Sequence, residues 1–154
     1  MHHVIVLELV NLFCSGILAG SLFLIHYGVR KPLGTLEDRP QIQLRQSLIY
    51  RLRVLIPAVF VPTVLSGVAA AILDWSGPGS IFRSVGALSA LVCFLTTLAG
   101  TAPINAAVLT WQPDAPPKDW RLQVSRWGRL DAARTWLALG SLALMVAAMA
   151  FKPV

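Results

Sequence analysis

Long runs of hydrophobic residues, separated by short charged stretches, dominate the pattern of the chain. A helix that crosses a bilayer needs about 20 mostly apolar residues, and four runs qualify: 4–26, 54–73, 81–111 and 130–151. Residues 40–53 have a helical pattern and should continue into the second run. The pattern therefore predicts an all-α fold, a four-helix transmembrane bundle that forms a single membrane domain over residues 1–154.

The basic residues indicate which side of the membrane the connections between the helices face. Eleven of the 13 lysines and arginines lie in or beside the first and third connections. The other two are Arg83, near the second connection, and Lys152, near the C-terminus. Because cytoplasmic loops carry an excess of positive charge, we expect both termini on the non-cytoplasmic side. We expect the membrane to be the bacterial inner (cytoplasmic) membrane.

The composition agrees with a membrane location and excludes several other classes of protein. Hydrophobic residues make up 56% of the chain and charged residues 13%, whereas a soluble domain averages about 25% charged residues. The net charge of +6 fits contact with anionic lipid. No RNA-binding motif or recognition helix accompanies it, so we exclude nucleic acid. Cys14 and Cys93 lie in apolar stretches without CxxC spacing, which argues against a disulfide framework or a zinc site.

Polar residues recur on one face of the first and third hydrophobic runs. Such residues are costly in hydrocarbon unless they face a partner or a cavity. Glu8 and Asn11 share a face at about 100° per residue, and we expect that face to point into the bundle. The row of Thr97, Thr101 and Asn105 in the third run should face inward for the same reason. Rows of serine and threonine are also common packing seams, so the row alone does not predict a site.

A first candidate site lies near the outer end of the first run. His2, His3 and Glu8 could bind a divalent or copper ion, because imidazole and carboxylate are suitable ligands. Adjacent histidines on a helix point in different directions, however, and a solvated terminus is the alternative. Whether a metal binds is therefore left open.

A second candidate site lies near the cytoplasmic end, where His26, Asn105 and Arg134 are expected at similar depth. His26 could act as a general base. Arg134 could stabilise an enolate or bind a carbonyl oxygen, and Asn105 could orient it. These three are the candidate catalytic residues, and the candidate substrate-binding residues near them are Tyr27, Arg51, Thr101 and Trp127. The alternative is that the arginines reach lipid phosphates and that Asp131 pairs with Arg134 along one helix.

One group of motifs connects the third and fourth runs. It comprises Pro103-Ile104-Asn105, then Trp111, a proline-bearing loop, Arg126-Trp127 and Arg134-Thr135. In these residues the sequence resembles the anthrone oxygenase-like family of small four-helix membrane proteins. The resemblance implies a four-helix membrane fold. It also implies the activity of the characterised members, which oxidise anthrones to anthraquinones with dioxygen.

The resemblance and the second candidate site together predict a membrane oxidoreductase, an oxygenase that acts on a lipophilic aromatic small molecule. A base would remove a benzylic proton, and the electron-rich carbanion would react with dioxygen, so that no cofactor is required. The alternative is a non-catalytic helical subunit of a larger membrane protein assembly. Gly16 and Gly20 form a GxxxG pair that permits close approach by another helix, which also suits a homo-oligomer. Transport is a weaker alternative, because the chain is short and lacks inverted repeats.

Overall fold

The computed structural model describes the backbone of residues 2–151 and the side chains of residues 4–151. Its helical segments join end to end into four long rods. The first rod consists of α1 (His2–Phe23), the π-helical segment η1 (Leu24–Val29) and α2 (Arg30–Gly34). The second rod is α3 (Asp38–Leu73). The third consists of α4 (Ser80–Thr96), the π-helical segment η2 (Thr97–Thr101) and α5 (Ala102–Thr110), and the fourth is α6 (Trp120–Ala150).

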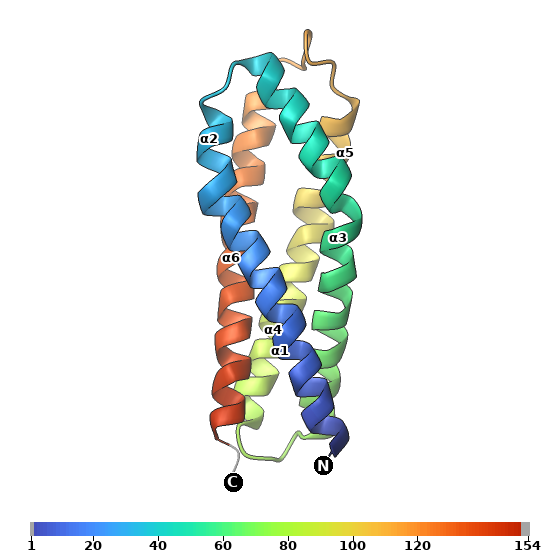
Figure 1. Ribbon diagram of the computed structural model, residues 1–154, viewed down its shortest axis with the longest axis vertical. Helices are drawn as coiled ribbons and strands as arrows, with labels where there is room; N and C mark the ends of the chain where they lie inside the picture. The colour runs from blue at the N-terminus through green and yellow to red at the C-terminus, as the bar shows by residue number, and fades with distance from the viewer. Residues whose placement is uncertain (1, 152–154) are drawn as a thin grey trace.

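The four rods run alternately up and down and pack side by side (Figure 1). The first and last described residues lie at one end of the bundle, and the α2–α3 and α5–α6 connections lie at the other, here called the loop end. Helix α1 packs chiefly on α3, and α4 packs chiefly on α6. Both ends of the described segment therefore lie on one side, as an even number of spans requires. Which side of the membrane that is stays a prediction.

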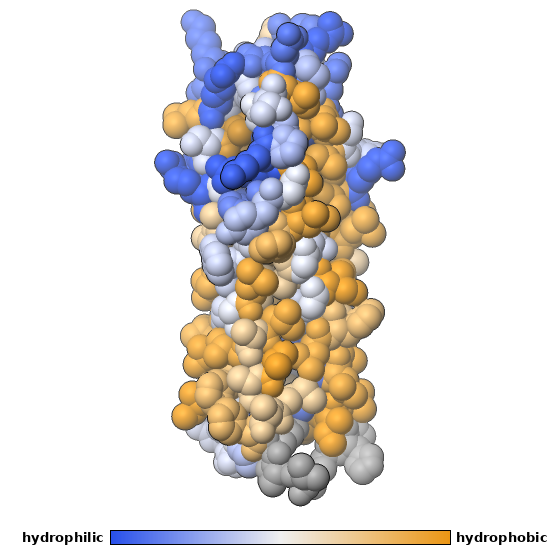
Figure 2. Space-filling view, turned by 60° about the vertical axis from the view of Figure 1, so that its left-hand side comes forward, coloured by the Kyte–Doolittle hydropathy of each residue, from blue (hydrophilic) through white to orange (hydrophobic). Residues whose placement is uncertain are grey.

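All four rods are long and apolar enough to cross a membrane: 4–34, 38–73, 80–110 and 120–150. This confirms the predicted four-helix transmembrane bundle. The helices nevertheless extend beyond the hydrophobic runs, since α6 begins at Trp120 and the first rod continues to Gly34. The backbone stays helical where the hydropathy falls, and α3 confirms the expected continuation of residues 40–53. Hydrophilic residues crowd the loop end, while hydrophobic residues cover most of the remaining visible face (Figure 2).

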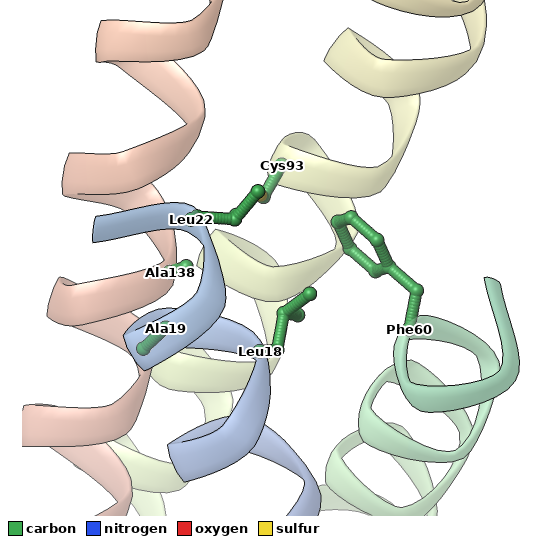
Figure 3. Close-up of a cluster of buried hydrophobic side chains, with 6 residues drawn as sticks. All are labelled: Leu18, Ala19, Leu22, Phe60, Cys93 and Ala138. Atoms are coloured by element: carbon green, nitrogen blue, oxygen red, sulfur yellow. The ribbon is translucent and has the colours of Figure 1, made fainter. Parts of the chain in front are cut away.

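Two clusters of buried apolar side chains hold the rods together. The first joins all four rods and consists of Leu18, Ala19, Leu22, Phe60, Cys93 and Ala138 (Figure 3). The second consists of Ile42, Ile104, Val108, Trp111 and Trp120. In it the rings of Trp111 and Trp120 meet edge to face, with centroids 6.5 Å apart. On α6, Ala138 belongs to the first cluster and Trp120 to the second. Between them, Val124, Trp127 and Leu130 pack against the second cluster and Leu137 packs against the first.

The polar face of α1 points into the bundle, as predicted. Glu8 and Asn11 are 4% and 1% exposed, and Asn11 Nδ2 donates to the Thr63 carbonyl oxygen at 2.8 Å. The GxxxG pair behaves differently, because a Cβ added at Gly16 or Gly20 would meet nothing within 4 Å. Among the described residues, no helix makes the close approach that this pair would permit.

Candidate functional site

The site centres on Asp131, a fully buried carboxylate of α6. Its Oδ2 lies 3.0 Å from His26 Nδ1. Its Oδ1 accepts a hydrogen bond from Arg134 NH2 at 3.4 Å, and Thr135 Oγ1 donates to its backbone carbonyl at 2.8 Å. One carboxylate therefore holds an imidazole from the first rod and a guanidinium from the fourth.

Arg134 is the second member of this network and is 5% exposed. Its NH1 donates to Thr101 Oγ1 at 2.6 Å, and its backbone carbonyl accepts a hydrogen bond from Cys93 Sγ at 3.3 Å. Its Nε finds no acceptor among the described residues. The guanidinium is thus fixed from two directions and keeps one buried donor without a partner.

Two π-helical segments deliver the partners of this α6 pair. His26 lies within η1, where the Arg30 N–H reaches back to the Ile25 carbonyl oxygen. Thr101 is the last residue of η2, where the Ala102 N–H bonds the Thr97 carbonyl oxygen. Pro103 favours the wider turn, because it has no N–H to continue the normal pattern of an α-helix. Such segments are rare and frequently occur at functional sites. Here both adjoin the same ion pair.

A cavity of about 340 Å³ adjoins Arg134, near the lower limit of the ~300–1,000 Å³ usual for ligand pockets. Its apolar walls come mainly from α3 and α5 and include Leu48, Leu52, Ile56, Ala102, Ala106 and Leu109. Its polar lining consists of Thr97, Asn105, Trp127 and four arginines, Arg30, Arg45, Arg53 and Arg134. The cavity therefore presents donors and positive charge on a mostly apolar surface.

Most of the residues selected from the sequence gather at this cavity or at the network beside it. Asn105, Trp127 and Arg134 line the cavity, and Thr101 bonds Arg134. His26 does not line it. The imidazole reaches Arg134 through Asp131, and its chain neighbour Ile25 forms part of the wall. Asp131, interpreted from the sequence as an intrahelical partner of Arg134 only, therefore proves to be the residue that joins His26 to the site.

Two predicted substrate-binding residues lie away from the cavity. Tyr27 is 44% exposed, and its ring packs edge-on against His26 with centroids 4.7 Å apart. Arg51 is exposed and does not line the cavity. The arginine that α3 contributes deep inside is Arg45, 8% exposed. In the sequence, Arg45 is one of the basic residues grouped around the first connection. Its distance of six residues from Arg51 on one helix was the signal that the two face different ways.

Of the three proposed outer metal ligands, Glu8 is the one whose side chain the structure describes. The side chains of His2 and His3 lie outside the described residues. Glu8 Oε1 accepts a hydrogen bond from Arg83 Nε at 3.0 Å, and Arg83 is fully buried. Arg83 also bonds the side chain of Asp74 and the carbonyl oxygens of Asp74 and Pro78. Among the described residues, no three of His, Cys, Asp and Glu lie close enough together to hold a metal ion.

Comparison with known proteins adds one finding. Residues 46–144, which are 99 of the 154 residues, match the model of a protein family described as anthrone oxygenase. The matched segment contains Asn105, Trp127, Asp131 and Arg134, whereas His26 precedes it. No curated protein and no solved structure matches the chain.

Proposed function

The chain belongs to the anthrone oxygenase family as a membrane protein, and on this premise we propose that it oxidises a lipophilic aromatic substrate with dioxygen. The observation that carries the proposal is that Asn105 and Arg134 both line a mostly apolar cavity. Apolar walls suit a flat hydrocarbon skeleton. Side-chain donors such as these suit the oxygen on which negative charge develops.

The chemistry converts the methylene group of an anthrone into a ketone. Loss of a proton from the methylene carbon gives an enolate, whose charge rests largely on the opposite oxygen. Arg134 and Asn105 stabilise that oxygen, and the carbanion transfers its electrons to dioxygen. One oxygen atom ends in the new carbonyl and the other in water. The substrate and one O₂ thus give the quinone and one H₂O, and the substrate supplies all four electrons.

In this proposal His26 accepts the proton. With Nδ1 bonded to Asp131, the other ring nitrogen is the basic one, and the carboxylate orients the ring, as in many base–orienter pairs. His26 is absent from the cavity wall, so the proton reaches it through one water, which is within the usual reach of a general base. Asp131 has a second role, because it also positions Arg134.

The test is oxidation of 1,8-dihydroxyanthrone by the purified protein in lipid nanodiscs. The quinone is followed by absorbance, and ¹⁸O₂ should place one labelled atom in it. Asn105→Leu removes a cavity donor that has no hydrogen bond to another described side chain, and we expect a loss of about 10²-fold or more in rate. Arg134→Gln should lose at least as much. Arg129→Gln, an equal charge change at an exposed position of the same helix, should retain the wild-type rate.

Protein-free nanodiscs give the rate of spontaneous oxidation. A wild-type rate no higher than this background, in protein that is folded by circular dichroism, would contradict the proposal. The non-catalytic subunit would then be the better hypothesis. Equal rates in wild type and Asn105→Leu would contradict the placement of the reacting oxygen.

A further inference from the structure

The part of the cavity nearer the loop end contains a second set of buried donors that the proposed oxidation does not use. Arg45 is 8% exposed, and its guanidinium carbon lies 5.5 Å from the centre of the Trp127 ring. Arg45 Nε and Trp127 Nε1 are both buried and have no acceptor among the described residues. No ion pair within the described part of the chain joins Arg45 to a carboxylate. Buried donors and charges in native proteins almost always have partners, so these two point to acceptor atoms on a ligand.

A second cation strengthens the charge at this end. Arg30 lines the cavity and donates from NH1 to the Gly128 carbonyl oxygen at 3.3 Å. It lies so close to the α6 backbone that a Cβ at residue 128 would collide with its guanidinium. Arg30 and Arg45 carry like charges that act on each other, and no carboxylate lines the cavity. The carboxylate that also acts on Arg45, Asp131, is already bonded to His26 and Arg134. Two arginines that line one cavity without a carboxylate in its wall favour an anion there.

We propose that Arg45, Arg30 and the Trp127 N–H bind a carboxylate group of the substrate. The planar fork of an arginine matches a carboxylate with two parallel hydrogen bonds. The inference rests on the proposed function for the other end of the substrate, where Asn105 and Arg134 hold the reacting ring. Trp127 and Arg134 are seven residues apart, which is about 10 Å along α6. The substrate is therefore an aromatic acid, with its carboxylate about one polycyclic skeleton away from the oxygen that Arg134 contacts.

The experiment measures binding without turnover. Anthraquinone-2-carboxylate and anthraquinone-2-carboxamide have nearly the same shape and differ in charge, and both are already oxidised. Each is titrated by calorimetry into wild-type protein in zwitterionic nanodiscs, with empty nanodiscs subtracted. We expect the carboxylate to bind about tenfold tighter or more, the scale of hydrogen bonds to a charged group. Arg45→Gln should abolish the preference and leave the carboxamide affinity within about twofold.

Arg129→Gln is the matched control, since it removes the same charge from an exposed site and should keep the preference. Equal affinities of the two quinones in wild type would overturn the inference. An equal loss of the carboxylate preference in Arg129→Gln would also overturn it, because it would indicate attraction to the basic surface alone. Displacement of the carboxylate by stoichiometric phosphatidylglycerol would overturn it too, because it would indicate a site for a lipid headgroup. If Arg45→Gln does not fold, Trp127→Phe removes the indole donor, keeps an aromatic ring beside Arg45, and should weaken binding of the carboxylate more than that of the carboxamide.

The two proposals fail separately in this design. Oxidation of the anthrone together with equal quinone affinities would leave the oxygenase and remove the carboxylate site. A carboxylate preference without oxidation would leave the binding site and remove the proposed reaction.

Discussion

The buried cluster around Arg83 allows a test of the structure that is independent of function. Arg83 is fully buried, and each of its three nitrogens has an acceptor. The acceptors come from Glu8 on α1 and from Asp74 and Pro78 in the α3–α4 connection. Arg83 thus fixes the first rod to the α3–α4 connection. Arg83→Met keeps an unbranched apolar stem and removes every one of these bonds.

The loss of stability follows from the buried groups that Arg83→Met leaves without a partner. Glu8, at 4% exposure, loses this cation in the protein interior, and two backbone carbonyls lose their donor. Removing one partner of a buried ion pair usually costs about 3–5 kcal/mol. For a chain of this size each kcal/mol corresponds to about 2–4 °C, so the melting temperature should fall by roughly 6–20 °C. Replacing both partners, in Arg83→Met with Glu8→Met, should recover part of the loss, because an apolar pair leaves no buried charge.

The assay is thermal unfolding in detergent, followed by circular dichroism. Arg129→Met, at an exposed position, is the control and should change stability by no more than about 0.5 kcal/mol. The reasoning fails if Arg83→Met melts within that range of wild type. It also fails if the double variant is less stable than Arg83→Met, since the two side chains would then contribute independently.

Three further predictions follow from single positions. Gly67→Ala should cost about 1–3 kcal/mol of stability, because its Cβ would lie 2.9 Å from Asn11 Nδ2; Gly20→Ala, which meets nothing within 4 Å, should leave the melting temperature unchanged or higher. In a variant without native cysteines, a membrane-impermeant thiol reagent added outside should label a cysteine at position 78 and miss one at position 116; labelling at 116 would reverse the predicted orientation. His26→Ala should slow anthrone oxidation by about 10²-fold with helix content unchanged, and an unaltered rate would exclude it as the base.

The sequence predicted the four spans and their polar interior faces because both depend on local patterns. A run of apolar residues identifies a span, and a carboxyl such as Glu8 in that run must face inward. Helix ends were predicted less well. Residues 120–129 are polar enough to resemble a loop, yet they continue α6 through its charged first turns.

The residues whose burial the sequence did not predict are arginines whose partners are distant in sequence. Arg83 and Arg45 were counted as charges near the connections, which is the usual place for an arginine in a membrane protein. Burial of Arg83 depends on Glu8, 75 residues away. The link from Asp131 to His26 spans 105 residues. No pattern along a single helix contains that information, because it depends on how the rods pack.

The polar cluster around Arg83 and the polar residues that line the cavity differ in how completely their hydrogen-bonding atoms have partners. Every donor nitrogen of Arg83 is satisfied by protein oxygens, as expected of a cluster that only holds helices together. Within the described residues, four buried polar side-chain atoms lack a partner: Asn11 Oδ1, Arg45 Nε, Trp127 Nε1 and Arg134 Nε. Three of the four belong to residues that line the cavity described above. Such unmet donors destabilise a folded protein by about 1–3 kcal/mol each, so their concentration around one space is best explained by a ligand whose oxygens complete them.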